Sequence, residues 1–156
     1  MKTTLVAVGT RMPGWVEAGT AEYEKRIARD LGFTVREVAA AKRHKSGDTA
    51  RYIQQESDNL LAQVNQGDFV VALEVEGKLI STVELANTLD QLRLDGQNLT
   101  LLVGGPDGLS DDCRKRANAQ WSLSRMTLPH PLVRVIVAEQ LYRAWSFLND
   151  HPYHRE

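Results

Sequence analysis

The chain has 156 residues, the usual length of a single domain. Its 42% hydrophobic and 25% charged residues are typical of a globular protein and argue against a disordered chain. The longest apolar runs are far shorter than the roughly 20 residues that span a membrane. The start, residues 1–8, has too short an apolar core for a signal peptide, and Cys113 has no second cysteine to pair with. We therefore expect one domain over residues 1–156, in the cytoplasm, with no membrane contact.

The formal net charge of −1 hides an uneven distribution. Residues 1–45 contain nine basic and five acidic side chains, and residues 114–156 contain seven and three. The middle, residues 46–113, contains three basic and twelve acidic side chains. If the two basic ends meet in space, they create a local positive field suited to a polyanion. Chance segregation explains the same counts equally well.

The first half of the chain alternates strand and helix patterns. A buried strand is predicted over Thr4–Val8, and a helix follows with apolar residues at helical spacing up to a stop at Gly32. Phe33–Val38 is predicted as a second strand. A basic loop, residues 42–47, leads to a helix over residues 53–64 that ends before Gly67.

The next segments continue the alternation. The continuous apolar run Phe69–Val75 predicts a strand buried on both faces, and a turn is expected at Gly77 and Lys78. Ser81 and Glu84 form a capping-box pattern at the start of a helix. Leu99–Val103 is predicted as another buried strand. Alternating apolar strands and helices predict an α/β fold, a mostly parallel sheet with helices on both faces.

The last third contains the longest predicted helix. After the glycine loop Gly104–Gly108, Ser110 can cap a short helix, and Trp121–Thr127 is predicted as a strand. Leu132–Leu148 is then predicted as a helix. Its apolar residues surround it, which predicts that a second subunit covers one face.

Two arginines of this helix lie on opposite sides of it when the residues are placed about 100° apart. Arg143 follows Glu139 at the i,i+4 spacing that favours an ion pair. Arg134 falls on the opposite, apolar side. It either extends to the surface or places a positive charge near a ligand or RNA.

A ligand is expected at the carboxyl ends of the parallel strands. Three segments lie there: Leu73–Gly77, Gly104–Gly108 and Leu123–His130. Glycines after a strand allow a ligand to approach the backbone closely, although a tight turn explains them too. The chain has no dinucleotide-binding fingerprint, P-loop or nucleophile elbow. The histidines lack metal-ligand spacing, so no metal site is expected.

The tail after the last helix is unusually rich in chemistry for a chain end. His151, Tyr153, His154 and Arg155 fall within the last six residues. Aromatic and basic side chains together suit stacking on a base and binding of phosphate. Because these residues lie beyond the last helix, we expect little core packing to depend on them.

Several long stretches resemble a family of small SPOUT methyltransferases that act on large-subunit ribosomal RNA. They are Ser122–Val135, Ala138–Ser146 and His151–Arg155, joined by Val6–Thr10 and Gly104–Gly108. Asp107 stands where glutamate would also be expected. The resemblance implies a C-terminal trefoil knot and a homodimer. It also implies methyl transfer from S-adenosyl-L-methionine to N3 of a pseudouridine in 23S rRNA of the assembled ribosome, without a metal.

The resemblance also implies where the cofactor binds. The cofactor would lie against the backbone of Leu73, Gly104, Gly105, Leu123, Ser124, Arg125, Met126, Thr127 and Leu128. Tyr153, His154 and Arg155 would reach the target nucleotide, together with Arg143 or Arg134. His130, the titratable group at the end of the cofactor segment, is the first choice for handling the N3 proton, although a purely structural role between two prolines fits it as well.

Two alternatives stay open at this stage. One is a SPOUT methyltransferase that modifies another RNA nucleoside, for example at a ribose 2'-hydroxyl. The other is a knotted dimer that binds RNA without catalysis. Binding of adenosylmethionine separates the second alternative from both enzymes.

Overall fold

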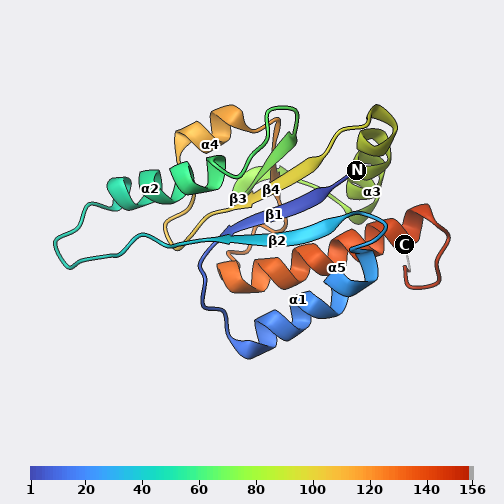
Figure 1. Ribbon diagram of the computed structural model, residues 1–156, viewed down its shortest axis with the longest axis horizontal. Coiled ribbons are helices and arrows are strands. Elements are labelled where there is room, and N and C mark those ends of the chain that lie inside the picture. Colours follow the sequence, from blue (N-terminus) through green and yellow to red (C-terminus); the bar gives the residue numbers. More distant parts are fainter. Residues whose placement is uncertain (155–156) are drawn as a thin grey trace.

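The computed structural model describes residues 1–154 and contains one five-stranded sheet in which all strand pairs are parallel. Its order is β2-β1-β4-β3-β5, and helices cover both faces (Figure 1). The strands are β1 (Thr3–Val8), β2 (Phe33–Val38), β3 (Phe69–Leu79), β4 (Leu99–Val103) and β5 (Ala119–Ser122). The helices are α1 (Gly14–Ile27), α2 (Thr49–Leu61), α3 (Thr82–Asp95), α4 (Asp111–Arg116) and α5 (His130–Leu148). The predicted fold class is confirmed.

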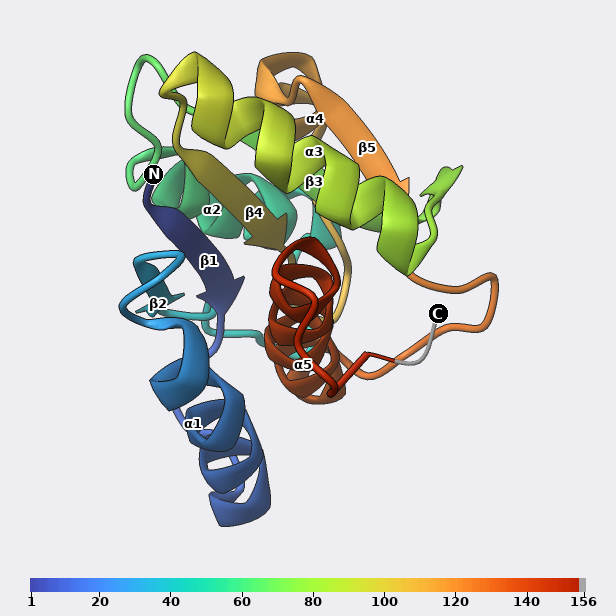
Figure 2. The same ribbon diagram turned by 90° about the vertical axis from the view of Figure 1, so that its right-hand side faces the viewer.

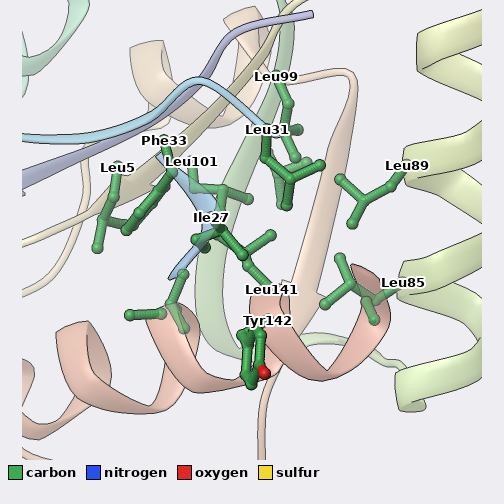
Figure 3. Close-up of a cluster of buried hydrophobic side chains, with 14 of the residues drawn as sticks. Leu5, Ile27, Leu31, Phe33, Leu85, Leu89, Leu99, Leu101, Leu141 and Tyr142 are labelled. Atoms are coloured by element: carbon green, nitrogen blue, oxygen red, sulfur yellow. The ribbon is translucent and has the colours of Figure 1, made fainter. Parts of the chain in front are cut away.

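The central strand β1 shows why its sequence is apolar throughout. Successive side chains of a strand point to opposite faces, so Leu5 and Ala7 join one core cluster while Val6 and Val8 join the other. The larger cluster lies between the sheet and helices α1, α3 and α5, and Figure 3 shows Leu5, Leu85 and Leu141 within it. The smaller cluster lies under α2 and α4.

Local signals predicted two helix starts correctly. Ser81 caps α3 with both hydrogen bonds of the capping box, from Glu84 N to Ser81 Oγ and from Ser81 N to Glu84 Oε2. The side chain of Ser110 accepts a hydrogen bond from Cys113 N at the start of α4. Cys113 is buried in the smaller core cluster.

The predicted turn at Gly77 and Lys78 is wrong. Strand β3 continues to Leu79, and Lys78 pairs with Trp121 after a register shift that follows Leu73. A Cβ atom at Gly77 would lie 2.7 Å from the backbone carbonyl carbon of Trp121. Glycine is therefore needed at this position for the close approach of two strands.

The strand predicted over Trp121–Thr127 is too long at its carboxyl end. Strand β5 ends at Ser122, whose hydroxyl donates a hydrogen bond to the carbonyl of Ser124, 2.8 Å away. The residues after it leave the sheet and form the loop that leads to α5 (Figure 2). Apolar composition alone did not separate this loop from the strand.

Helix α5 begins at His130, two residues before its predicted start. Pro131 is accommodated because the first turn of a helix needs no backbone N–H at that position. The helix packs against α1 and α3, and no residue between His130 and Leu148 is fully exposed. One chain thus covers part of the apolar perimeter that led us to expect a second subunit. The trefoil threading of the chain stays a prediction.

Within residues 1–154, no helix has both the length and the apolarity needed to cross a bilayer.

Candidate functional site

The carboxyl edge of the sheet has a cavity of about 660 Å³. This size is typical of small-molecule sites. Its walls come from residues 73–76 in the middle of β3, from the end of β4, from β5 and from the loops after β4 and β5. Arg114 of α4 and the first turn of α5 complete them. The lining includes eight of the nine predicted cofactor residues: Leu73, Gly104, Gly105, Leu123, Ser124, Met126, Thr127 and Leu128. The prediction that these three distant segments meet at one edge of the sheet is therefore confirmed.

Arg125 is the ninth predicted cofactor residue, and its side chain lies elsewhere. Its guanidinium donates hydrogen bonds to the carbonyls of Val75 and Gly77, the latter over 3.0 Å. These bonds fasten the loop after β5 to the irregular half of β3. Arg125 shapes the cavity wall without lining the cavity.

The glycine loop is both a tight turn and part of the cavity wall. A Cβ atom at Gly104 would lie 2.7 Å from Gly108, and Gly108 has a left-handed φ of +88°. At Gly105 a Cβ atom would lie 2.9 Å from Oε1 of Glu56 and 3.1 Å from Cγ1 of Val8. A side chain there would therefore collide with α2 and β1.

The electrostatics of the cavity are set by two carboxylates on its β3 side, those of Glu74 and Glu76. The Nε atom of Arg114 donates a hydrogen bond of 2.8 Å to Glu74, which raises the pKa of Arg114 and balances that carboxylate. Glu76 forms no ion pair with any residue from 1 to 154. The cavity thus combines apolar walls with one unbalanced negative charge, an arrangement that suits a small organic cation.

His130 lines the cavity from the first position of α5. Its Nδ1 atom is buried and has no hydrogen-bond partner in the described part of the chain. Burial lowers the pKa of His130, and the nearby charge of Arg134 lowers it further. The imidazole is therefore neutral at pH 7 and can accept a proton from a bound molecule.

Arg134 is 2% exposed, so the expectation that it extends to the surface is wrong. It pairs with the carboxylate of Glu37 and donates hydrogen bonds to the carbonyls of Val8 and Gly9, over 3.2 and 2.8 Å. These contacts fix α5 to the carboxyl end of β1. The residue supports the position of His130, one turn earlier on the same helix.

The described part of the tail folds back onto α5. The hydroxyl of Tyr153 donates a hydrogen bond of 2.9 Å to Oε1 of Glu139, which also accepts one of 2.9 Å from Nε of Arg143. The Arg143 guanidinium lies 4.9 Å from the centre of the Tyr153 ring, and that ring lies 4.5 Å from the ring of Tyr142. The expectation that the tail contributes little to core packing is therefore wrong for Tyr153.

The two histidines of the tail are half-buried as well. The backbone N–H of His151 donates a hydrogen bond of 2.9 Å to the carbonyl of Ser146. The ring of His154 packs edge-on against Phe147, with the ring centres 5.5 Å apart. Arg155, the remaining predicted catalytic residue, lies outside the described residues.

The predicted catalytic residues thus form two groups in one chain. His130 lines the cavity, whereas Arg143, Tyr153 and His154 do not. Arg143 is 13 positions beyond His130 on α5, about 20 Å along the helix axis at 1.5 Å per residue. A single chain does not bring the tail and the cavity together.

Sequence reasoning placed the segment Leu73–Gly77 at the site without singling out Glu74 and Glu76 within it, and it missed Arg114. Both glutamates lie within β3, in the part that continues past the last pair with β4. Arg114 lies on the short helix α4 and reaches the cavity from a different layer. No local pattern in the sequence indicates that reach.

A parallel α/β domain with a small-molecule cavity at its carboxyl edge is the class that these observations define. A family model described as "Predicted SPOUT methyltransferase" matches residues 1–154. The chain is 56% identical to a "Ribosomal RNA large subunit methyltransferase H" from Hahella chejuensis (strain KCTC 2396), over 156 residues and the full length of both chains. The chain belongs to the SPOUT methyltransferase family, which confirms the resemblance seen in its sequence.

Solved structures support the same fold. A putative methylase family protein from Neisseria gonorrhoeae superposes with a TM-score of 0.56 at 14% identity, over 90% of this chain and 81% of that one. A tRNA (m1G37) methyltransferase from Aquifex aeolicus gives a TM-score of 0.56 at 14% identity, over 92% and 70%. At such low identity these likenesses bear on the fold alone.

Proposed function

We propose that this protein transfers a methyl group from S-adenosyl-L-methionine to N3 of a pseudouridine in 23S rRNA of the assembled ribosome, in the cytoplasm. The observation that carries the proposal is the cavity of about 660 Å³, where the predicted cofactor segments converge beside a neutral histidine. The name of the full-length relative at 56% identity supports ribosomal RNA as the substrate.

The cavity residues fit the proposed methyl donor. The leucine side chains and the glycine backbone of the lining offer an apolar slot for adenine. The unbalanced carboxylate of Glu76 complements a molecule that carries ammonium and sulfonium charges. Bound there, adenosylmethionine would supply an electrophilic methyl group, because its sulfonium would become a neutral thioether on transfer.

The task left to the protein is to position the nucleotide and to handle its N3 proton. Neutral His130, which lines the cavity, accepts this proton as the nitrogen becomes nucleophilic. Arg134 fixes the first turns of α5 to the carbonyl of Gly9, and this contact positions the backbone of His130. Exclusion of water by the apolar walls keeps the nucleophile reactive.

The proposed enzyme is a homodimer in which the tail of one chain serves the cavity of the other. This arrangement reconciles the roles predicted for Arg143, Tyr153, His154 and Arg155 with the roughly 20 Å that separate Arg143 from His130 along α5. Half-buried aromatic side chains at the end of α5, Trp145 and Phe147, offer apolar surface for a partner.

The proposed reaction is tested by incubating the protein and labelled adenosylmethionine with ribosomes that lack the modification. Nuclease digestion and mass spectrometry then locate the label. We expect one labelled pseudouridine, methylated on its base. Label on a ribose would favour the 2'-hydroxyl alternative, and binding of adenosylmethionine without transfer would contradict the proposal.

The shared site is tested by mixing two inactive variants. One variant carries His130→Asn, and the other ends after Asp150. If each cavity uses the tail of its partner, a mixed dimer contains one complete site, and mixing restores part of the activity. Two variants that stay inactive after exchange of subunits, verified by mass spectrometry of intact dimers, would contradict the shared site.

A further inference from the structure

The segment between β2 and α2, together with the first residues of α2, carries positive charge that the cavity does not explain. We call residues 39–51 the basic arm, because they contain Lys42, Arg43, Lys45 and Arg51 but only one acidic residue, Asp48. Figure 1 shows the loop part of this segment projecting from the sheet edge where β1 and β2 end. This is also the edge that bears the cavity.

Most of the positive charge of the basic arm faces solvent. Lys42, Lys45 and Arg51 are exposed, and none of them forms an ion pair with a residue from 1 to 154. The carboxylate of Asp48 accepts a hydrogen bond of 3.0 Å from Ala50 N at the start of α2. The arm therefore presents cations without partners of its own.

Arg43 is the exception, and it fastens the arm to the protein. It donates hydrogen bonds of 2.7 and 3.1 Å to the two carboxylate oxygens of Glu56, and it pairs with Asp107 over 2.9 Å. Glu56 is fully buried and also accepts a hydrogen bond of 2.9 Å from Ala41 N. A buried carboxylate is retained only with such partners, so the base of the arm is firmly placed.

The same contacts fix the arm relative to the cavity. Asp107 belongs to the glycine loop, and its neighbours Pro106 and Gly108 line the cavity. Glu56 also lies against the glycine loop, since a Cβ atom at Gly105 would be 2.9 Å from its Oε1 atom. The base of the arm, next to the free lysines in the chain, is thus held against the glycine loop at the rim of the cavity.

We propose that the basic arm is a docking surface for RNA, where Lys42, Lys45 and Arg51 contact backbone phosphates next to the target nucleotide. The inference rests on the proposed function, because it takes the substrate to be RNA. Flexible ammonium groups suit phosphates as point charges. Contacts of this kind orient a nucleic acid without reading its sequence, so the arm would place the strand over the cavity.

The test compares two double variants of equal charge change. In Lys42→Gln/Lys45→Gln the arm loses two cations. In the control, Lys2→Gln/Arg29→Gln, two exposed cations are lost beside the amino ends of β1 and β2, at the opposite edge of the sheet. Binding to unmodified ribosomes is measured between 50 and 200 mM salt, and adenosylmethionine affinity is measured by calorimetry. Ultraviolet cross-linking with mass spectrometry identifies which peptides contact nucleotides.

We expect the arm variant to bind ribosomes at least tenfold more weakly at low salt, with adenosylmethionine affinity within twofold of the wild type. The slope of log affinity against log salt should become shallower by about 1 to 2, since each phosphate contact contributes roughly 0.7 to 0.9. The control should keep the wild-type slope. Nucleotide adducts should appear on the peptide that contains Lys42 and Lys45.

Equal slopes for the arm variant and the control would overturn the inference. So would cross-links that join the arm to ribosomal protein only, because the partner would then be an acidic protein surface. A different result would contradict the proposed function itself. In that case the wild-type protein would not methylate ribosomes, whether or not the arm contacts RNA.

Discussion

The sequence predicted functional residues both in the cavity and in the C-terminal tail, but the structure places these two regions apart. Three distant segments converge on the cavity at one edge of the parallel sheet. Two of them follow β4 and β5, and the third is the part of β3 that continues past its last pair with β4. The tail follows a helix, and no comparable rule fixes its position. It packs on the outer side of α5, away from the cavity.

The polar groups of the two regions differ as well. In the cavity, Nδ1 of His130 is buried without a partner, whereas the exposed carboxylate of Glu76 forms no ion pair within residues 1–154. In the tail, the Tyr153 hydroxyl and the Arg143 guanidinium are both paired with Glu139. Because unpaired buried polar groups are costly, they tend to mark places where a ligand completes the bonding. Both regions contain such an atom, because Nδ1 of His154 is also buried without a hydrogen-bond partner in residues 1–154. They differ in that His130 belongs to the lining of the cavity and His154 does not.

The largest expected effect comes from removing the tail after Asp150. Methyl transfer to ribosomes should fall more than about 100-fold, the loss associated with positioned catalytic groups. Adenosylmethionine affinity should stay within about tenfold, or 1.4 kcal/mol, because the cavity is separate. Calorimetry and a transfer assay measure the two effects, and sedimentation checks that the dimer persists. Normal transfer by the truncated protein would leave the tail with a packing role only.

The variant His130→Asn tests the cavity side of the comparison. We expect transfer to fall about 100-fold, the effect of losing a general base. Because burial lowers the pKa of His130, the acid limb of the wild-type pH–rate profile should lie below the ordinary value of 6.5, and the variant should lack this limb. An unchanged profile would assign the proton to another group.

Stability should follow the same titration. The unfolded chain binds a proton at the ordinary histidine pKa, whereas folded His130 binds one only at lower pH. The free energy of unfolding should therefore decline as the pH falls below 6.5, and His130→Asn should decline less. Denaturant titrations at pH 7 and pH 5.5 compare the two proteins.

The variant Gly105→Ala probes the glycine loop. The added Cβ atom would lie 2.9 Å from Glu56 Oε1 and 3.1 Å from Val8 Cγ1, and such overpacking costs typically 1 to 3 kcal/mol. Displacement of the loop should weaken adenosylmethionine binding about tenfold. Gly67→Ala, where a Cβ atom meets nothing within 4 Å, serves as the control. Equal affinities of the two variants would show that the loop does not contact the cofactor.

The smallest effect is expected for Tyr153→Phe, which removes the hydrogen bond to Glu139 and keeps the ring. The loss should be about 1 kcal/mol in the free energy of unfolding, the usual net contribution of one hydrogen bond. Chemical denaturation measures it, with Tyr153→Ala as the comparison that also removes the packing on Tyr142. If both variants match the wild type in stability, the tail is not held on α5 in solution.

Regular patterns made most of the fold predictable. Strands β2 and β4 begin and end at their predicted residues, Phe33–Val38 and Leu99–Val103. The capping box of α3 lies at Ser81, because hydrogen bonds between near neighbours determine it. Gly77 escaped prediction because its reason is a distant strand, the backbone of Trp121.

The parts of the candidate site whose positions depend on strand order were predictable. The parts that depend on long side chains reaching from one layer of the fold to another were not. The strand-end rule placed Leu73, Gly104 and Leu123 together. It could not place the guanidinium of Arg134, which reaches across to Glu37 on the edge strand β2. Nor could it show that the tail would return to Glu139, since that contact depends on the tertiary course of the last residues.

The most direct test of the account is a crystal structure of the protein with adenosylmethionine. We predict the cofactor in the cavity between Gly104–Gly108 and the loop after β5, with its methyl group toward His130. Adenosylmethionine bound between α1 and α5, or beside Tyr153, would contradict the assignment of the cavity as the methyl-donor site.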